Sequence, residues 1–119
     1  DVTGFGLAGH LLEMCEAADL TATLDTATLP ELPALDSYIE MGCVPGGTQR
    51  NFDASHERLP SLTSRQQAVL CDPQTSGGLL VAVKADGKHA FETLCKNNGF
   101  YLQPIGEIVP VTTPTVNVY

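Results

Sequence analysis

Apolar residues recur at helical spacing in several parts of the chain. Within residues 7–18, apolar side chains lie three or four positions apart and acidic residues occupy the other face. Residues 86–98 repeat this pattern and are followed by Gly99, a residue type common just past helix ends. Shorter helices are predicted at residues 34–41 and at residues 63–70, where a Thr-Ser pair can cap the first turn.

Four segments have strand patterns. Leu20–Leu24 alternates apolar and polar residues, which predicts a strand with one buried face. The continuous apolar run at residues 79–83 predicts the central strand of a sheet. Residues 101–109 predict a further strand with Gly106 at a bulge, and residues 115–119 alternate as expected for an edge strand.

Residues 44–62 have no regular pattern and are predicted to form a long, partly ordered loop, a kind of segment that often carries function. The predicted helices and strands are interleaved but do not form clean βαβ units. We therefore expect an α+β fold in which helices flank a mixed β-sheet. Residues 1–119 are expected to form a single domain, since domains usually contain ~100–200 residues.

The composition narrows the class of protein. Of the 119 residues, 43% are apolar and 17% are charged, which excludes a disordered acidic tail. No apolar run is long enough to cross a bilayer, and no basic stretch followed by an apolar one indicates a secretory signal. The chain opens at Asp1 inside a motif and without Met, from which we expect a C-terminal piece of a longer protein.

Acidic residues outnumber basic ones, since 14 Asp and Glu against 6 Lys and Arg give a net charge of −8. This charge argues against nucleic acid and against an anionic membrane surface as partners, and it leaves room for a bound cation such as Mg²⁺. The four cysteines lie far apart without a C-x-x-C pair, so we expect reduced thiols in a cytoplasmic protein. Cys15 and Cys95 fall within helical patterns and are expected in the core.

Glycines mark the start of the chain. Gly4, Gly6 and Gly9 form a G-x-G-x-x-G pattern, and Asp25 follows 16 residues after Gly9. In a dinucleotide-binding module such glycines follow a strand, and an acidic residue binds the ribose. Only three residues precede Gly4 here, so the alternative is that the glycines allow a tight entry into the first helix. The pattern alone is compatible with both interpretations.

Polar residues gather in three places. The carboxylate of Asp1 can cap the first helix or bind a cation that a phosphate also contacts. Residues 45–51 read Pro-Gly-Gly-Thr-Gln-Arg-Asn and can wrap an anion or form an ordinary turn. Residues 72–78 read Asp-Pro-Gln-Thr-Ser-Gly-Gly, and their two final glycines indicate a close backbone approach beside a polar cleft.

His10 shares no metal-ligand spacing with another histidine and is expected to be structural.

Taken together, these motifs resemble the C-terminal domain of the selenophosphate synthetase (selenide, water dikinase) family. The segments at residues 1–10, 45–51 and 72–80 match that family in order and spacing, and residues 105–107 resemble a fourth, shorter motif. The segment at residues 72–80 also occurs in the wider aminoimidazole-ribonucleotide-synthetase (PurM-like) superfamily. The resemblance implies a fold like the PurM C-terminal domain.

The resemblance also implies an activity for the full enzyme, which would use ATP, selenide and water to make selenophosphate, AMP and phosphate, with Mg²⁺. It implies a homodimer with a separate N-terminal domain that carries a nucleophilic Cys or selenocysteine, a nearby Lys and most metal-binding aspartates. The family's one metal-ligating Asp from the C-terminal domain falls on Asp1. None of the four cysteines matches the nucleophile, so the isolated chain is expected to be inactive.

Other residues of the three motifs are expected to face the cleft between the two domains, close to phosphate or selenide. They are small or polar residues, or glycines that expose backbone amides: Thr3, Gly46, Gly47, Thr48, Asn51, Gln74, Thr75, Ser76, Gly77 and Gly78. Two further interpretations are another ATP-dependent enzyme of the same superfamily and a structural or interaction domain that binds no metal.

Overall fold

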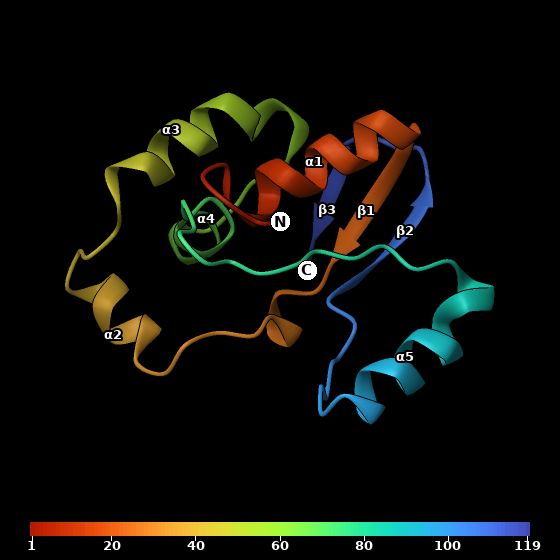
Figure 1. Ribbon diagram of the computed structural model, residues 1–119. Coiled ribbons are helices and arrows are strands. Elements are labelled where there is room, and N and C mark those ends of the chain that lie inside the picture. Colours follow the sequence, from red (N-terminus) through yellow and green to blue (C-terminus); the bar gives the residue numbers. More distant parts are fainter.

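The computed structural model describes residues 1–119 and contains five α-helices and three strands (Figure 1). Short 3₁₀ turns follow β1 and α3 and precede α5. The elements, in chain order, are α1 (Gly6–Ala18), β1 (Leu20–Leu24), α2 (Leu35–Glu40), α3 (Gly46–Ser55), α4 (Ser64–Leu70), α5 (Lys88–Asn97), β2 (Gly106–Pro110) and β3 (Val116–Val118).

The three strands form one mixed sheet in the order β2-β1-β3. β1 lies in the centre and runs antiparallel to β2, with Leu20 opposite Pro110, and parallel to β3, with Ala22 opposite Val116. The expected α+β fold with a mixed sheet and a C-terminal edge strand is therefore confirmed.

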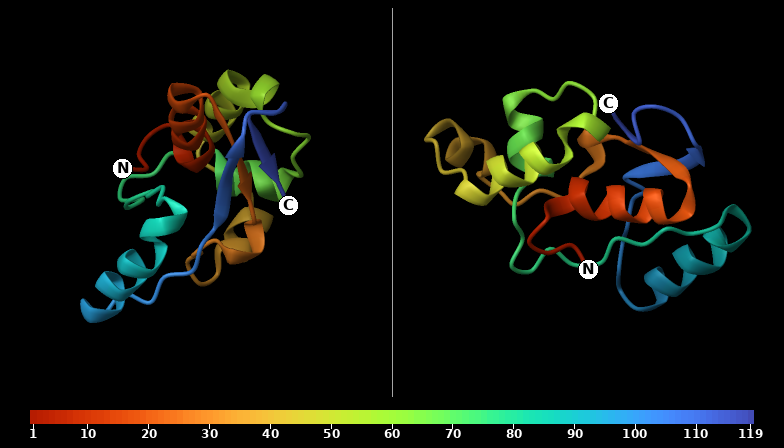
Figure 2. Two further views of the ribbon diagram at one scale, coloured as in Figure 1. Left: turned by 90° about the vertical axis from the view of Figure 1, so that its right-hand side faces the viewer. Right: turned by 90° about the horizontal axis from the view of Figure 1, so that it is seen from above.

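The core lies between α1 and the sheet. α1 contacts β1 and β3 on one side and α3 and α4 on the other (Figure 2). The core therefore connects the sheet to these two helices through α1. Neither α2 nor α5 contributes a buried residue, and both extend away from this centre (Figure 1). The buried cluster consists of Ala8, Leu11, Leu12, Cys15, Ala22, Leu24, Leu59, Leu70, Cys71 and Val116.

The strand predicted at residues 79–83 is wrong. This segment forms no strand and makes no backbone hydrogen bond, and Leu79 is 77% exposed. The central position in the sheet belongs to β1, whose alternating sequence buries Thr21, Ala22 and Leu24. A continuous apolar run shows only that a segment favours burial, not which neighbour buries it.

The long loop predicted at residues 44–62 is also wrong, because α3 and a 3₁₀ turn occupy most of it. The helical signal in α3 is weak because only Thr48 and Ser55 are buried, seven positions or two helical turns apart. Pro45 at the N-cap, followed by two glycines, resembles a turn in sequence, although proline and small residues are also common where helices begin.

Smaller differences concern the C-terminal half. The strand predicted at residues 101–109 begins only at Gly106, which pairs regularly with Leu24 rather than forming a bulge. An added Cβ at Gly106 would collide with the Thr23 carbonyl oxygen, so the glycine is required by the close approach of β1. Cys15 is buried as expected, whereas Cys95 is only partly covered.

Candidate functional site

The first and third sequence motifs lie against each other. The backbone N–H of Val2 donates to the Gly78 oxygen at 2.8 Å, and the Gln74 N–H donates to the Thr3 oxygen at 3.0 Å. A Cβ built on Gly77 would lie 2.5 Å from the Val2 oxygen, so only glycine fits there. The close backbone approach expected for the two glycines is therefore confirmed, and the neighbour is the N-terminal segment.

Asn51 brings the second motif to the same place. Its side-chain nitrogen donates to the backbone oxygens of Gly4, at 2.8 Å, and Cys71, at 2.9 Å. The start of α3 also abuts the third motif, because a Cβ on Gly47 would lie 2.9 Å from Pro73 Cγ. Three segments that are far apart in the sequence thus form one contiguous surface.

α1 begins against the end of α4. Gly6 has a φ of +73°, and an added Cβ would lie 2.9 Å from backbone atoms of Leu70, Cys71 and Asp72. The N-cap of α1 is Phe5, and no side chain caps the helix. The capping role considered for Asp1 is therefore wrong, and Asp1 is exposed.

Side chains of the first motif are linked to α1. Thr3 Oγ1 lies 3.0 Å from His10 Nε2, and His10 Nδ1 lies 3.1 Å from Glu13 Oε2. The ring of Phe5 lies beside the imidazole, with 5.5 Å between ring centroids. Sequence patterns did not reveal this chain of contacts, although the spacing of His10 and Glu13 is that of neighbours on a helix face.

The predicted cleft residues divide into an exposed group and a structural group. Thr48 belongs to the structural group, because it is 2% exposed and its Oγ1 has no hydrogen-bond partner. Asn51 is partly covered, and both of its amide hydrogens are used. Gly47 and Gln74 are also partly covered. The exposed group consists of Thr3, Gly46, Thr75, Ser76, Gly77 and Gly78.

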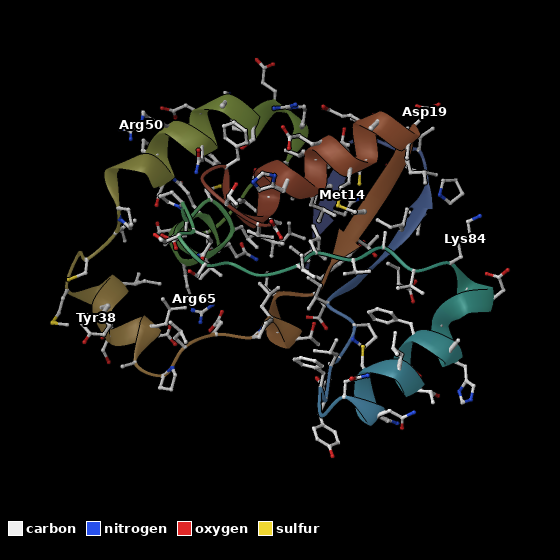
Figure 3. All side chains as sticks on the ribbon, in the orientation of Figure 1. Met14, Asp19, Tyr38, Arg50, Arg65 and Lys84 are labelled. Carbon is white, nitrogen blue, oxygen red and sulfur yellow. The ribbon has the colours of Figure 1, made fainter.

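An arginine without an ion pair lies at the start of α3, in a chain that is acidic as a whole. A Cβ on Gly47 would lie 3.7 Å from Arg50 Nη2, so the guanidinium covers the first turn of this helix. Arg58 and Arg65 pair with carboxylates, whereas Arg50 forms no ion pair. Figure 3 shows Arg50 on the outer side of α3. Unpaired positive charge next to helix N–H groups favours anions.

The end of α4 contains two groups with altered acidity. Burial raises the pKa of the Cys71 thiol to about 11, so it is protonated near neutral pH. Burial also raises the pKa of the Asp72 carboxyl, to whose Oδ2 the Gln74 side chain donates at 2.6 Å. Cys71 is therefore a core residue and not an activated nucleophile.

Comparison with known proteins decides the family. The profile of the AIR synthase related protein, C-terminal domain, family matches residues 1–118. The chain belongs to this family. It is 56% identical over 118 residues to a selenide, water dikinase of Colwellia psychrerythraea and 51% identical over 118 residues to one of Pseudomonas aeruginosa. Each match covers 99% of this chain, which spans about a third of each relative's length (34%).

In this AIR synthase related domain, Asp1 is an exposed carboxylate that has no partner within the chain. No three His, Cys, Asp or Glu side chains come together as a metal site. An exposed carboxylate is a type of donor that Mg²⁺ prefers. No helix of the domain has the length and apolar character needed to span a membrane.

The dinucleotide-binding interpretation is wrong for this domain. Residues 1–3 form no strand, and Gly6 is covered by backbone of residues 70–72 instead of facing open space. Asp25 caps the 3₁₀ turn after β1 by accepting a hydrogen bond from the Ala27 N–H at 2.9 Å. Gly6 therefore serves the tight entry into α1, as the alternative interpretation expects, whereas a Cβ on Gly4 would meet nothing within 4 Å.

Proposed function

We propose that this chain is the C-terminal domain of a selenide, water dikinase, which forms selenophosphate, AMP and phosphate from ATP, selenide and water. The observation that supports this most strongly is the similarity to selenide, water dikinases at 51–56% identity over nearly the whole chain. The sequence motifs of that family are also the segments that meet at one surface around Asn51. The longer protein that contains this domain is called the parent protein below.

The surface formed by the three motifs is proposed to face ATP or its phosphate products across a cleft with the parent's own N-terminal domain. Its exposed members combine hydroxyl groups with glycine amides, both of which bind phosphate oxygens. The start of α3, with Arg50 beside Gly47, adds positive charge to this surface. Thr48 and Asn51 are proposed to support it from beneath, because they are covered by neighbouring residues.

Asp1 is proposed as the one Mg²⁺ ligand of this domain. A carboxylate at the edge of the surface suits Mg²⁺, which is typically held by one or two carboxylates together with substrate phosphates. When bound, the ion would neutralise phosphate charge during transfer. The other protein ligands, the reactive Cys or selenocysteine and its Lys would come from the N-terminal domain of a cytoplasmic homodimer. The isolated 119-residue chain is consequently proposed to be inactive.

The test compares the parent protein with its Asp1→Asn variant, assayed by AMP formation from ATP with selenide at increasing Mg²⁺. The exchange keeps the shape of the side chain and removes its charge. We expect activity to fall at low Mg²⁺ and to recover partly as Mg²⁺ rises. Asp36→Asn is the matched control, because Asp36 lies on α2 and pairs with Arg65. Equal activity of the Asp1→Asn variant and wild type at every Mg²⁺ concentration would contradict the metal role.

A further inference from the structure

The strongest unassigned arrangement in the molecule is the chain of contacts Thr3–His10–Glu13. Oxygen and nitrogen atoms lie 3.0 Å apart between Thr3 and His10 and 3.1 Å apart between His10 and Glu13. The three residues are a hydroxyl, an imidazole and a carboxylate in series, at ordinary hydrogen-bond distances. The His10 side chain is 18% exposed, whereas that of Glu13 is 61% exposed.

When the imidazole is neutral, the chemistry of the three groups assigns a direction to each hydrogen bond. The Glu13 carboxylate can only accept, so His10 Nδ1 carries the proton and donates to it. In the neutral imidazole, Nε2 is then an acceptor, and the Thr3 hydroxyl donates to it. Both lone pairs of Thr3 Oγ1 are left without a partner in this exposed residue.

The backbone of Thr3 is held as firmly as its side chain. Its carbonyl oxygen accepts hydrogen bonds from the N–H groups of Gly6 and Gln74, each at 3.0 Å. The neighbouring Val2 is buried and donates to the Gly78 oxygen at 2.8 Å. The hydroxyl is therefore fixed in position by two loops and in direction by His10. An oxygen held in this way is preorganised to accept a hydrogen bond.

We propose that Thr3 Oγ1 accepts a hydrogen bond from the water molecule consumed in the reaction, and that His10 and Glu13 are positioning residues for this hydroxyl. This inference rests on the proposed function, because that reaction uses water as a substrate. Thr3 lies two residues from Asp1 and is an exposed member of the surface where phosphate is proposed to bind. An acceptor there would hold the water with its oxygen free to face phosphorus.

The test measures selenide-dependent AMP formation by variants of the parent protein. Thr3→Val removes the hydroxyl with little change in shape, and Thr3→Ser keeps it. His10→Phe keeps a planar ring beside Phe5 and removes both nitrogens, whereas His10→Gln can place an oxygen near the position of Nε2. The matched control for Glu13→Gln is Glu16→Gln, because Glu16 lies one turn further along α1 and pairs with Arg58.

We expect Thr3→Val and His10→Phe each to lower kcat about 10- to 100-fold with little change in KM for ATP, since a misplaced reactant costs rate rather than affinity. The double variant should be about as slow as either single variant, because the two residues act as a unit. Thr3→Ser should keep most of the activity, and His10→Gln should be faster than His10→Phe. Glu13→Gln should be slower than Glu16→Gln, which should match wild type.

A second readout follows the hydrogen bonds themselves. Nitrogen-15 spectra of the histidine-labelled parent, assigned with His10→Phe, should show the proton on Nδ1 in the neutral ring of wild type. Wild-type kcat in Thr3→Val, or a Thr3→Ser variant as slow as Thr3→Val, would overturn the water-positioning role. A proton on Nε2 would overturn the proposed hydrogen-bond direction. A wild-type parent that forms no AMP with selenide would instead refute the proposed function, and the water-positioning role with it.

Discussion

The side-chain amide of Asn51 donates a 2.8 Å hydrogen bond to the backbone oxygen of Gly4, 47 residues away in the sequence. The same nitrogen donates to the Cys71 oxygen at 2.9 Å. One side chain therefore connects α3 to the residues just before α1 and just after α4. The three segments whose sequences resemble enzyme motifs depend on this junction for their arrangement.

Removing the Asn51 amide should destabilise the fold. Asn51→Ala leaves the carbonyl oxygens of Gly4 and Cys71 without this donor, and we expect the free energy of unfolding to fall by about 1–3 kcal/mol. Urea denaturation measures the loss. Asn98→Ala is the control, since its amide donates only to the Leu94 oxygen at the end of the exposed α5. Equal losses in the two variants would show that Asn51 has no special structural role.

Gly6 and Gly4 offer a matched pair for the entry into α1. Gly6→Ala places a Cβ 2.9 Å from backbone atoms of residues 70–72 at a φ of +73°, whereas a Cβ on Gly4 meets nothing within 4 Å. We expect Gly6→Ala to lower the free energy of unfolding by about 1–3 kcal/mol and Gly4→Ala to change it far less. Thermal unfolding of both variants checks this, and similar midpoints would contradict the close packing at Gly6.

Arg65 attaches α2 to the rest of the molecule. Its guanidinium donates to both carboxylate oxygens of Glu31 and to Asp36 Oδ1, and these bonds raise its pKa. α2 buries no residue, so little else holds it. We expect Arg65→Ala to speed amide hydrogen exchange in α2, while Arg58→Ala leaves that exchange unchanged. Unchanged exchange in Arg65→Ala would mean that other contacts hold α2.

Cys71 makes stability depend on pH in the alkaline range. Its pKa is about 11 in the folded chain against an ordinary 9.0, so the unfolded chain loses the proton first. The free energy of unfolding should therefore fall as pH rises from about 9 to about 11. Cys71→Ala should reduce this slope, and Cys43→Ala, at an exposed position, should not. Alkylation of the folded protein at Cys71 as fast as at Cys43 would contradict this account.

Sequence patterns predicted the helices and strands whose regularly spaced apolar residues face the core. α1 and β1 follow from their apolar spacing, because each turns one apolar face to the core. The start of α4 follows from a capping box in which Thr63 and Gln66 satisfy each other's backbone N–H groups. In these elements, local chemistry and long-range packing favour the same structure.

The missed elements depend on neighbours far away in the chain. α3 has few apolar residues and is held by Asn51 and Thr48 against other segments, which no local pattern reveals. The meeting of the three motifs likewise depends on hydrogen bonds between residues 20 to 76 positions apart, from Asn51–Cys71 to Val2–Gly78. The sequence also did not show which residues contact single motif residues, such as His10 beside Thr3, and the role proposed for Thr3 depends on that contact.

Selenide dependence decides whether the parent protein is a selenide, water dikinase. The most direct measurement is phosphorus NMR of the parent protein incubated with ATP and Mg²⁺, with and without selenide. We expect selenophosphate, AMP and phosphate to appear together, and only when selenide is present. ATP consumption that is independent of selenide, or that ends at ADP, would contradict the proposed function and leave only membership of the AIR synthase related family.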